Sequence, residues 1–498
     1  MKTQPRIVFV ISTLLLLALV ASLAPSSGPI PARAEPDYLG DPCHIAVTVV
    51  NGTTDYDIAA VGVSSYINWL TINYNNVPPN IEHVNVLRVR EDLYMDQYNN
   101  LTTLVPSHPG QVWIIGNEPD VPHGGQDNLL PEVYAQRFYD FASRIRDLDS
   151  TARIGFAPIA QPTPLRLKYL DRVFARLSTT TQYGPPLAGG LSQTLALIDI
   201  FTIHGFTVNE GYREWGAGIP AGFAPNDPDA YKIDIWTELY KTHDINLFST
   251  WVTSMRVWMR DHGARGKPLW VTEYGSLMPP LDPPGADFFN VSDEDSRDYM
   301  LATFSFIYNT TSTDYGYPAD NNRLVQRGYW YSLNERRDRF GGSLFDPINK
   351  QRTIIGDAFV EYDPPVPKVN QDPYLVGLNF VPLKYSLGSG MTRVDYRIDV
   401  RVGNFITTEN RVPIRLNLSL DGSNPPKTLS GYISRCGGAG NFSFFWNDLE
   451  PLVDYSVHLN VEIDPTSSMQ DLNLSNNTID SNVVPTEPSL VFLPEIIR

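Results

Sequence analysis

The chain has 498 residues, more than one hydrophobic core usually holds, so we expect at least two domains. Hydrophobic residues make up 42% and charged residues 19%, a composition typical of folded proteins that excludes a wholly disordered chain. Asp and Glu outnumber Lys and Arg by 55 to 38, a formal charge of −17, which argues against a nucleic-acid partner because phosphates are bound by basic side chains.

Residues 1–34 have the pattern of a signal peptide. Lys2 and Arg6 precede an apolar run over Ile7–Leu23, and Ala32–Ala34 (ARA) has the small-x-small pattern of a cleavage site. The apolar run is near the lower length limit for a membrane-spanning helix, so an uncleaved membrane anchor is the alternative. We therefore expect a secreted protein that is either free outside the cell or associated with its surface.

Residues 35–362 alternate between short apolar runs and amphipathic stretches. Apolar runs without polar alternation are typical of parallel strands that are covered on both faces. Such runs predict strands at Gly62–Trp69, Val84–Val89, Val112–Ile115, Ala152–Ala157, Asp199–Ile203, Leu269–Thr272 and Gly328–Tyr331. Helical spacing of apolar residues predicts helices at Pro131–Leu148 and Thr250–His262.

The repetition of strand and helix over this length predicts the α/β class and, within it, a (β/α)8 or TIM barrel. We take Gly62–Trp69 as the first barrel strand, and the third strand is not visible in the pattern. A doubly wound open sheet is the structural alternative.

Beyond the barrel, residues 363–373 are rich in proline and predict a linker. Strict alternation over Thr392–Val402, Arg411–Leu420 and Ser456–Ile463 then predicts half-buried strands. Residues 374–490 are therefore predicted to form a smaller all-β, immunoglobulin-like sandwich, followed by an apolar tail at 491–498.

Cys43 and Cys436 are the two cysteines of the chain. In an oxidising compartment they would form a bridge between the amino-terminal and carboxyl-terminal regions, and two unpaired thiols are the alternative. Neither belongs to a CxxC pair, and the eight histidines form no HExxH motif. We expect neither a metal nor another cofactor.

Two glutamates at predicted strand ends are the candidate catalytic pair. Glu118 lies in Gly116–Asp120 (GNEPD), after the Val112 strand, and Pro119 is expected to keep its backbone extended. Glu273 lies in Thr272–Gly275 (TEYG), after the Leu269 strand. Active sites of TIM barrels lie where the carboxyl ends of the strands meet, and three strand steps would put the two side chains across the barrel mouth from each other.

Together, these NEP and TEYG motifs resemble the acid/base and nucleophile motifs of glycoside hydrolase clan A. Residues 45–362 look like the catalytic core of its secreted bacterial members, near the family 128 type. The resemblance implies a retaining glycosidase that cleaves O-glycosidic bonds of a polysaccharide or oligosaccharide. It implies that Glu118 is the general acid/base, that Glu273 is the nucleophile, and that Asn117 contacts the 2-hydroxyl beside the cleaved bond.

Further residues are expected around the same cleft. Trp330 resembles the aromatic platform under the sugar, with barrel core as the alternative. His204, at the end of the Asp199 strand, would donate to substrate or to Glu118, with a structural histidine as the alternative. Arg88 is expected to orient the nucleophile carboxylate, with Arg90 on the same face as the alternative. Trp69 and Tyr274 are expected to line the cleft. Its walls are predicted to come from three loops, Gly124–Leu130, Pro279–Asp287 and, as the main specificity loop, Asn209–Asp229.

The C-terminal region resembles the cell-adhesion-related bacterial (CARDB-like) sandwich in Val402–Asn404 (VGN), the turn at Asp421 and Asp471–Thr478. This resemblance implies a spacer or adhesion module and supports association with a cell surface. For the whole chain, the alternative function is a non-catalytic carbohydrate-binding or adhesion protein on a TIM-barrel scaffold. The presence of both glutamates and Asn117 favours the enzyme.

Overall fold

The computed structural model describes residues 43–485, apart from 72–73, 75–76, 78–80, 123–124, 212–214, 281–290, 367, 389–390, 407, 409, 424 and 437–438. The predicted signal peptide at 1–34 and the apolar tail at 491–498 lie outside these residues. Among the described helices, none combines the length and the apolar character needed to cross a membrane.

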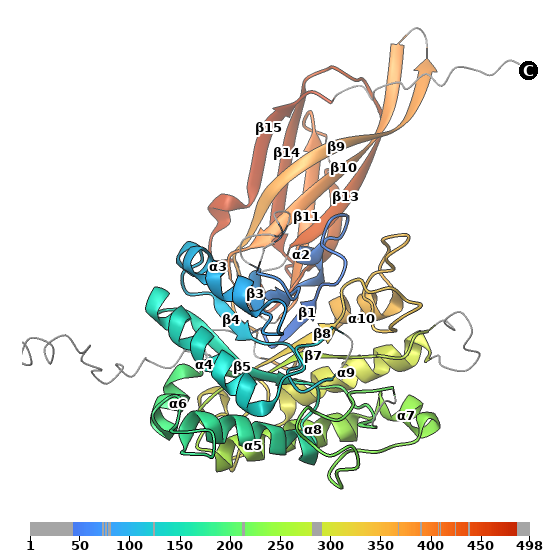
Figure 1. Cartoon of the computed structure of the whole chain (residues 1–498). Helices are drawn as coiled ribbons and strands as arrows, with labels where there is room; N and C mark the ends of the chain where they lie inside the picture. The colour runs from blue at the N-terminus through green and yellow to red at the C-terminus, as the bar shows by residue number, and fades with distance from the viewer. Residues whose placement is uncertain are drawn as a thin grey trace, which may run out of the picture. The chain divides into compact units, whose positions relative to one another are not determined.

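Eight parallel strands close into a barrel, and helices cover its outside (Figure 1). The barrel closes where β8 pairs with β1, with Ile45 opposite Gly328, so the predicted TIM barrel is confirmed and the open sheet is wrong. In chain order the strands are β1 (Ile45–Thr48), β2 (Ser65–Ile67), β3 (Glu82–Leu87), β4 (Val112–Ile115), β5 (Arg153–Ile159), β6 (Ile200–His204), β7 (Leu269–Gly275) and β8 (Arg327–Tyr331).

The strand numbering predicted from sequence was wrong at the start of the barrel. The first strand is β1, which the pattern missed, so Gly62–Trp69 contains the second strand and Val84–Val89 overlaps the third. β1 has only four residues, all buried, which is too short a run to stand out from the apolar sequence around it. The later strands fall where predicted, so Glu118 follows β4 and Glu273 lies on β7, three strand steps apart.

Two apolar layers hold the barrel. The larger one packs strand side chains against the helices, and the smaller one fills the barrel interior with strand residues such as Val84, Ile114, Trp270 and Tyr329. The described helices are α2 (Ile58–Val61), α3 (Tyr94–Ser107), α4 (Pro131–Leu148), α5 (Pro164–Ser178), α6 (Leu191–Leu197), α7 (Ile235–Lys241), α8 (Ile245–Asp261), α9 (Asp293–Asn309) and α10 (Ile354–Glu361), with 3₁₀ turns η2 (Pro318–Asp320) and η3 (Leu474–Asn476).

The two predicted helices are present. α4 has the predicted bounds, and Pro131 occupies its first turn, where a missing N–H costs nothing. α8 begins at Ile245 rather than Thr250, because the Asp244 side chain accepts a hydrogen bond from the Asn246 N–H and caps the helix one turn earlier.

The C-terminal part forms the predicted β-sandwich of two antiparallel sheets. One sheet has the order β13-β10-β9 and the other β12-β11-β14-β15. Alternate residues of β11 are buried, as the sequence alternation predicts. The strands are β9 (Pro373–Gly388), β10 (Met391–Asn404), β11 (Val412–Leu420), β12 (Lys427–Ile433), β13 (Gly440–Leu449), β14 (Tyr455–Ile463) and β15 (Thr478–Val483).

A disulfide joins the sandwich to the barrel. Cys43, just before β1, pairs with Cys436, which follows β12, and their Cα atoms are 5.6 Å apart, so the alternative of two free thiols is wrong. Beside it, the buried guanidinium of Arg435 donates to the carbonyl oxygens of Phe359 and Tyr362 at 2.8 and 2.6 Å. These carbonyl oxygens lie at the C-terminal end of α10, where the helix itself offers them no N–H donor, so the Arg435 guanidinium supplies their hydrogen bonds.

Candidate active site

A sharp turn after β4 brings Glu118 to the barrel mouth. Gly116 has φ 96°, and a Cβ there would lie 3.0 Å from the Tyr134 ring, so only glycine fits. Glu118 itself has φ 44°, so the extended backbone predicted from Pro119 is wrong. A non-glycine residue in this left-handed region is strained, and such strain is concentrated at functional sites. The Glu118 N–H is nevertheless satisfied by the Pro158 carbonyl on β5, at 3.0 Å.

An irregularity in β7 brings Glu273 to the same place. The pairing of β7 with β8 shifts register between Val271 and Tyr274, and its pairing with β6 shifts between Val271 and Glu273. Val271 and Tyr274 both belong to the layer that faces the helices, whereas Glu273 lines the cleft. Such irregularities re-aim side chains beside active sites.

His204, at the end of β6, connects the two glutamates. Its Nδ1 lies 2.9 Å from Glu118 Oε1, and its Nε2 lies 3.3 Å from Glu273 Oε1. All three side chains are buried. The prediction that His204 contacts Glu118 is therefore confirmed, and its contact with Glu273 is new. The two candidate catalytic carboxylates meet through one imidazole.

The electrostatics of this cluster favour protonation near neutral pH. Burial raises the pKa of Glu273 to about 7, and the negative charge of Glu118 adds to the rise. His204 and the Trp69 indole, which donates to Glu273 Oε1 at 2.5 Å, oppose it by stabilising the carboxylate. Burial alone would lower the pKa of His204, but attraction by Glu273 and the hydrogen bond to Glu118 raise it. The charge of Glu273 and that of His204 therefore each depend on the other.

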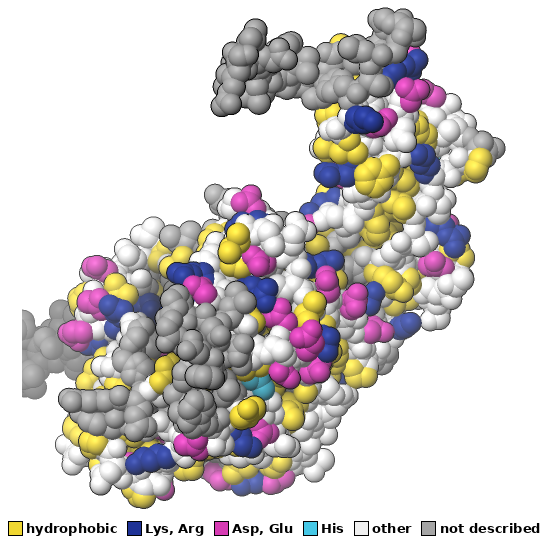
Figure 2. All heavy atoms as spheres, turned by 90° about the vertical axis from the view of Figure 1, so that its right-hand side faces the viewer, with side chains coloured by type: hydrophobic (Ala, Val, Ile, Leu, Met, Phe, Trp, Pro, Cys, Tyr) yellow, Lys and Arg dark blue, Asp and Glu magenta, His cyan; other side chains and the backbone are white. Residues whose placement is uncertain are grey.

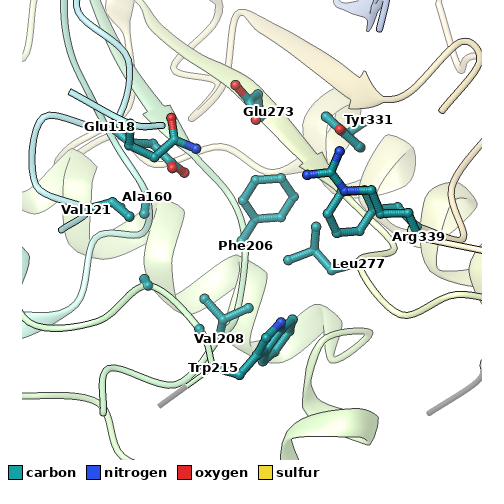
Figure 3. A pocket seen from close by; sticks show the side chains of 14 residues that line it. Glu118, Val121, Ala160, Phe206, Val208, Trp215, Glu273, Leu277, Tyr331 and Arg339 are labelled. Carbon is teal, nitrogen blue, oxygen red and sulfur yellow. The ribbon is translucent and has the colours of Figure 1, made fainter. Parts of the chain in front are cut away.

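A cleft of about 240 Å³ opens beside the carboxylates (Figure 3). Part of its wall is an apolar cluster that includes Phe206, Val208 and Ala217, with Leu277 and Tyr331 packed on it. Polar hydroxyls around apolar ring faces are what sugars present, so a partly apolar wall beside two carboxylates suits them. The described residues that line it are Glu118, Val121, Gln126, Ala160, Phe206, Val208, Trp215, Gly216, Ala217, Glu273, Leu277, Tyr331, Arg339 and Phe340.

Two of the predicted wall loops contribute to this cleft. Gln126 belongs to the predicted Gly124–Leu130 loop, and Trp215–Ala217 belong to the predicted specificity loop at Asn209–Asp229. Most of the third predicted loop, Pro279–Asp287, lies outside the described residues.

A fully buried arginine fixes one wall of the cleft. Arg166 on α5 forms ion pairs with Asp120 and with Glu210, the latter at 2.8 Å. The same guanidinium donates to the carbonyl oxygens of Ala217 and Gly218 at 2.7 and 2.9 Å. It thus ties the Glu118 turn to the segment that carries Trp215, which makes the cleft wall a rigid part of the fold.

The structure corrects two of the predicted lining residues. Trp330 is fully buried, donates its indole N–H to the Gly342 carbonyl at 2.7 Å, and packs edge-on against Tyr274. Both rings face the helices, so the core alternative holds for Trp330, and the predicted cleft position of Tyr274 is wrong. Tyr331, the next residue, points the other way because side chains alternate along a strand, and it lines the cleft.

Arg88 does not make its predicted contact with the nucleophile carboxylate, and the predicted contact of Asn117 with a sugar hydroxyl stays a prediction. Arg88 Nε donates to Asp127 Oδ1 at 2.8 Å rather than to Glu273, although its charge still favours the ionised form of Glu273. Asp127 comes from another loop, a partner that no local pattern reveals. The Asn117 amide donates to Gln126 Oε1 at 2.7 Å, and Gln126 in turn lines the cleft. Trp69 is not among the described residues that line the cleft, contrary to the prediction, and it takes part in the site through its bond to Glu273.

Sequence reasoning missed several residues of the site. Phe206 lies two residues after His204, a predicted site residue, so period-two spacing is the signal that would have found it. Tyr331 lies two residues after Tyr329, whose inward direction only the structure reveals. Arg339 and the Asp120–Arg166–Glu210 cluster had no such signal. Among the described residues, no group of three or more His, Cys, Asp or Glu side chains is arranged to hold a metal ion.

No protein-family model matches the chain, and no curated protein matches it. Solved structures do resemble it. One is a glucosidase from Croceicoccus marinus, at 10% identity over 82% of this chain and 94% of that one, with a TM-score of 0.39. Another is a GH128 (subgroup VII) oligosaccharide-binding protein from Trichoderma gamsii, at 10% identity over 63% of this chain and 92% of that one, with a TM-score of 0.37.

The C-terminal part resembles a CARDB domain from Pyrococcus furiosus, at 16% identity over 24% of this chain and 96% of that one, with a TM-score of 0.17. All three likenesses are distant.

Proposed function

We propose that this protein is a retaining glycoside hydrolase that cleaves O-glycosidic bonds of a polysaccharide or oligosaccharide. One observation carries the proposal: Glu118 and Glu273, from different strands, line one cleft and contact opposite nitrogens of the same buried imidazole. Two carboxyl groups that flank a sugar-sized cleft are what glycoside hydrolysis requires.

In the proposed reaction Glu118 is the general acid/base and Glu273 the nucleophile. Glu118 gives its proton to the glycosidic oxygen while the Glu273 carboxylate attacks the anomeric carbon, and the leaving sugar departs with that proton. Glu118, now a carboxylate, then takes a proton from a water molecule whose oxygen attacks the same carbon. This second attack breaks the bond to Glu273 and returns both groups to their first state.

The contacts of Glu273 support its role as nucleophile. Its Oε1 accepts the Trp69 indole N–H and faces His204, two groups that stabilise the carboxylate. The Asn117 contact with a sugar 2-hydroxyl stays a prediction. The Asn117 amide donates a hydrogen bond to Gln126, and the Gln126 side chain lines the cleft. Because His204 contacts both carboxylates, we propose that it stabilises, by a hydrogen bond, whichever of the two is negatively charged at each stage of the reaction.

We also propose that the protein works outside the cell. The leader pattern at residues 1–34 and the Cys43–Cys436 disulfide are both typical of exported proteins. The CARDB-like resemblance of residues 374–490 supports a role of the sandwich in holding the enzyme at a surface.

A non-catalytic carbohydrate-binding protein is the second candidate. The exposed Trp215 indole and the apolar wall would bind a sugar without any chemistry at the carboxylates. The two candidates differ in whether bound glycan is cleaved, so one experiment separates them.

The test is the release of reducing ends from a panel of polysaccharides, with product anomers read by NMR. Glu118→Gln and Glu273→Gln should each abolish release while the fold is kept, whereas Glu132→Gln, on α4 and paired with Arg172, should not. Glycan binding without release by the wild type would establish the non-catalytic candidate. Release with inverted anomers would refute the retaining mechanism.

A further inference from the structure

The cleft has a cationic end that the proposed reaction does not use. Arg339, on the segment after β8, lines the cleft together with Glu273 and Tyr331 (Figure 3). Its guanidinium carbon lies 5.2 Å from the centroid of the Phe340 ring. In the part of the chain that the structure describes, no carboxylate pairs with it.

The two arginines next to Arg339 in the chain do have carboxylate partners. On the same segment Arg336 pairs with Asp338 and Arg337 pairs with Asp293, both at 2.5 Å. The chain has 55 acidic residues, and acidic and basic side chains are intermixed over the face of the molecule in Figure 2. Carboxylates are thus plentiful, and yet Arg339, which lines the cleft, pairs with none of those in the described residues.

Arg339 is also held in place. Phe340, below its guanidinium, packs edge-on against Tyr331 with ring centroids 5.5 Å apart, and the Tyr331 hydroxyl donates to Glu335 at 2.9 Å. Glu335 is buried. These contacts fix the Phe340 ring, and the attraction between this ring and the guanidinium reduces the entropy that Arg339 loses when it binds a ligand.

The charges in the cleft are therefore polarised. Glu118 and Glu273 would repel an anionic group, whereas Arg339 would attract it, so an anionic sugar is favoured in one orientation only. A guanidinium presents paired N–H donors that match a carboxylate or a sulfate oxygen pair. Trp215, which is 48% exposed and lines the same cleft, offers a flat apolar face for a sugar ring.

We propose that the cleft takes an acidic glycan, in which a carboxylate or sulfate ester on a sugar near the cleaved bond binds Arg339 while a sugar ring packs on Trp215. The proposal rests on the proposed glycosidase function and names its substrate class. It does not follow from that function, because a neutral glycan would need neither the charge nor its position.

The test compares acidic polysaccharides with neutral forms of the same linkage. Uronate-containing polysaccharides are carboxyl-reduced, and sulfated polysaccharides are desulfated, so each pair differs only in charge. The wild type should release reducing ends faster from one of the two acidic forms than from its neutral counterpart, and the form that it prefers identifies the anion. Arg339→Gln should lose about tenfold to hundredfold in kcat/KM on that substrate, because a hydrogen bond to a charged group is lost.

Arg336→Gln is the matched control, since it removes an arginine from the same segment that pairs with Asp338 and does not line the cleft. Arg339→Lys, which keeps the charge without the fork, should fall between the wild type and Arg339→Gln. Equal cleavage of acidic and neutral forms, unchanged in Arg339→Gln, would overturn the proposal and leave the glycosidase standing.

Absence of cleavage in every pair would instead count against the proposed function. Binding of fluorescent acidic oligosaccharides by the wild type and by Arg339→Gln then decides the subsite. Weaker binding by Arg339→Gln than by the wild type supports the proposed subsite. Equal binding by the two proteins, or no binding by the wild type, overturns it.

Discussion

Replacement of Trp69 by phenylalanine should move the pH at which Glu273 ionises. The indole N–H donates to Glu273 Oε1 and favours the carboxylate, whose pKa burial has already raised to about 7. A hydrogen bond to a charged group contributes about 1.5–3 kcal/mol, and one pKa unit corresponds to about 1.4 kcal/mol. Loss of the bond should therefore raise the pKa of Glu273 by about one to two units, to about 8–9.

The sign of the activity change follows from the proposed role. A nucleophile attacks as the carboxylate, so kcat/KM rises with pH as Glu273 loses its proton, and the midpoint of this acidic limb should be near 7 in the wild type. In Trp69→Phe the midpoint should move up by the same one to two units. At pH 7 the variant should then have about a fifth to a fiftieth of the wild-type kcat/KM, with most of the loss recovered at high pH.

The pH profile of kcat/KM is the assay, and a carbon-13 NMR titration of the Glu273 carboxyl, assigned with Glu273→Gln, follows the same shift without substrate. Trp215→Phe is the matched control, because its indole lines the cleft without any bond to Glu273. An acidic limb that stays in place in Trp69→Phe would refute the reasoning. A wild-type profile that falls through pH 7 would assign Glu273 as the general acid and exchange the two roles.

Other variants test stability and placement. Because the pKa of Glu273 is raised in the folded protein, the folded protein binds this proton more tightly than the unfolded one, and stability falls as pH rises from about 4.5 to about 7. Glu273→Gln should therefore raise the free energy of unfolding by up to about 3 kcal/mol at pH 8 and by less at pH 5. Urea titrations at the two pH values measure both gains. The Cys43→Ser/Cys436→Ser double variant should lose about 2–5 kcal/mol, and a wild type whose melting is unchanged by reductant would contradict this. Trp330→Phe should cost about 1–3 kcal/mol of stability without weakening glycan binding, whereas Tyr331→Ala should weaken binding; the reverse pattern would contradict their placement.

Most of the barrel could be predicted because parallel strands covered on both faces leave continuous apolar runs in the sequence. This property also limits what the sequence can say about side-chain direction. When both faces are apolar, no polar residue marks which face points inward, so Trp330 and Tyr331 were equally good candidates for the cleft. The register shift in β7 adds to the problem, since strict alternation from Trp270 would have turned Tyr274 inward and Glu273 outward.

The candidate pair was predictable for a different reason. Strand order around a closed barrel follows chain order, so a glutamate at the end of β4 and one at the end of β7 meet at one face whatever the loops do. The groups that tune the pair come from elsewhere in the chain. Arg166 and Glu210 on the wall, and Asp127 beside Arg88, depend on packing between distant segments, which a single sequence does not encode in any local pattern.

The attachment of the sandwich limits what it can contribute to catalysis. Cys43 precedes β1, so the disulfide to Cys436 lies at the end where barrel strands begin, whereas Glu118 and Glu273 lie where strands end. Among the residues that the structure describes, all that line the cleft come from the barrel, between Glu118 and Phe340. The sandwich therefore does not shape this cleft directly. If the proposed surface association holds, removal of the sandwich should lower activity on insoluble glycan without changing kcat on a short soluble one.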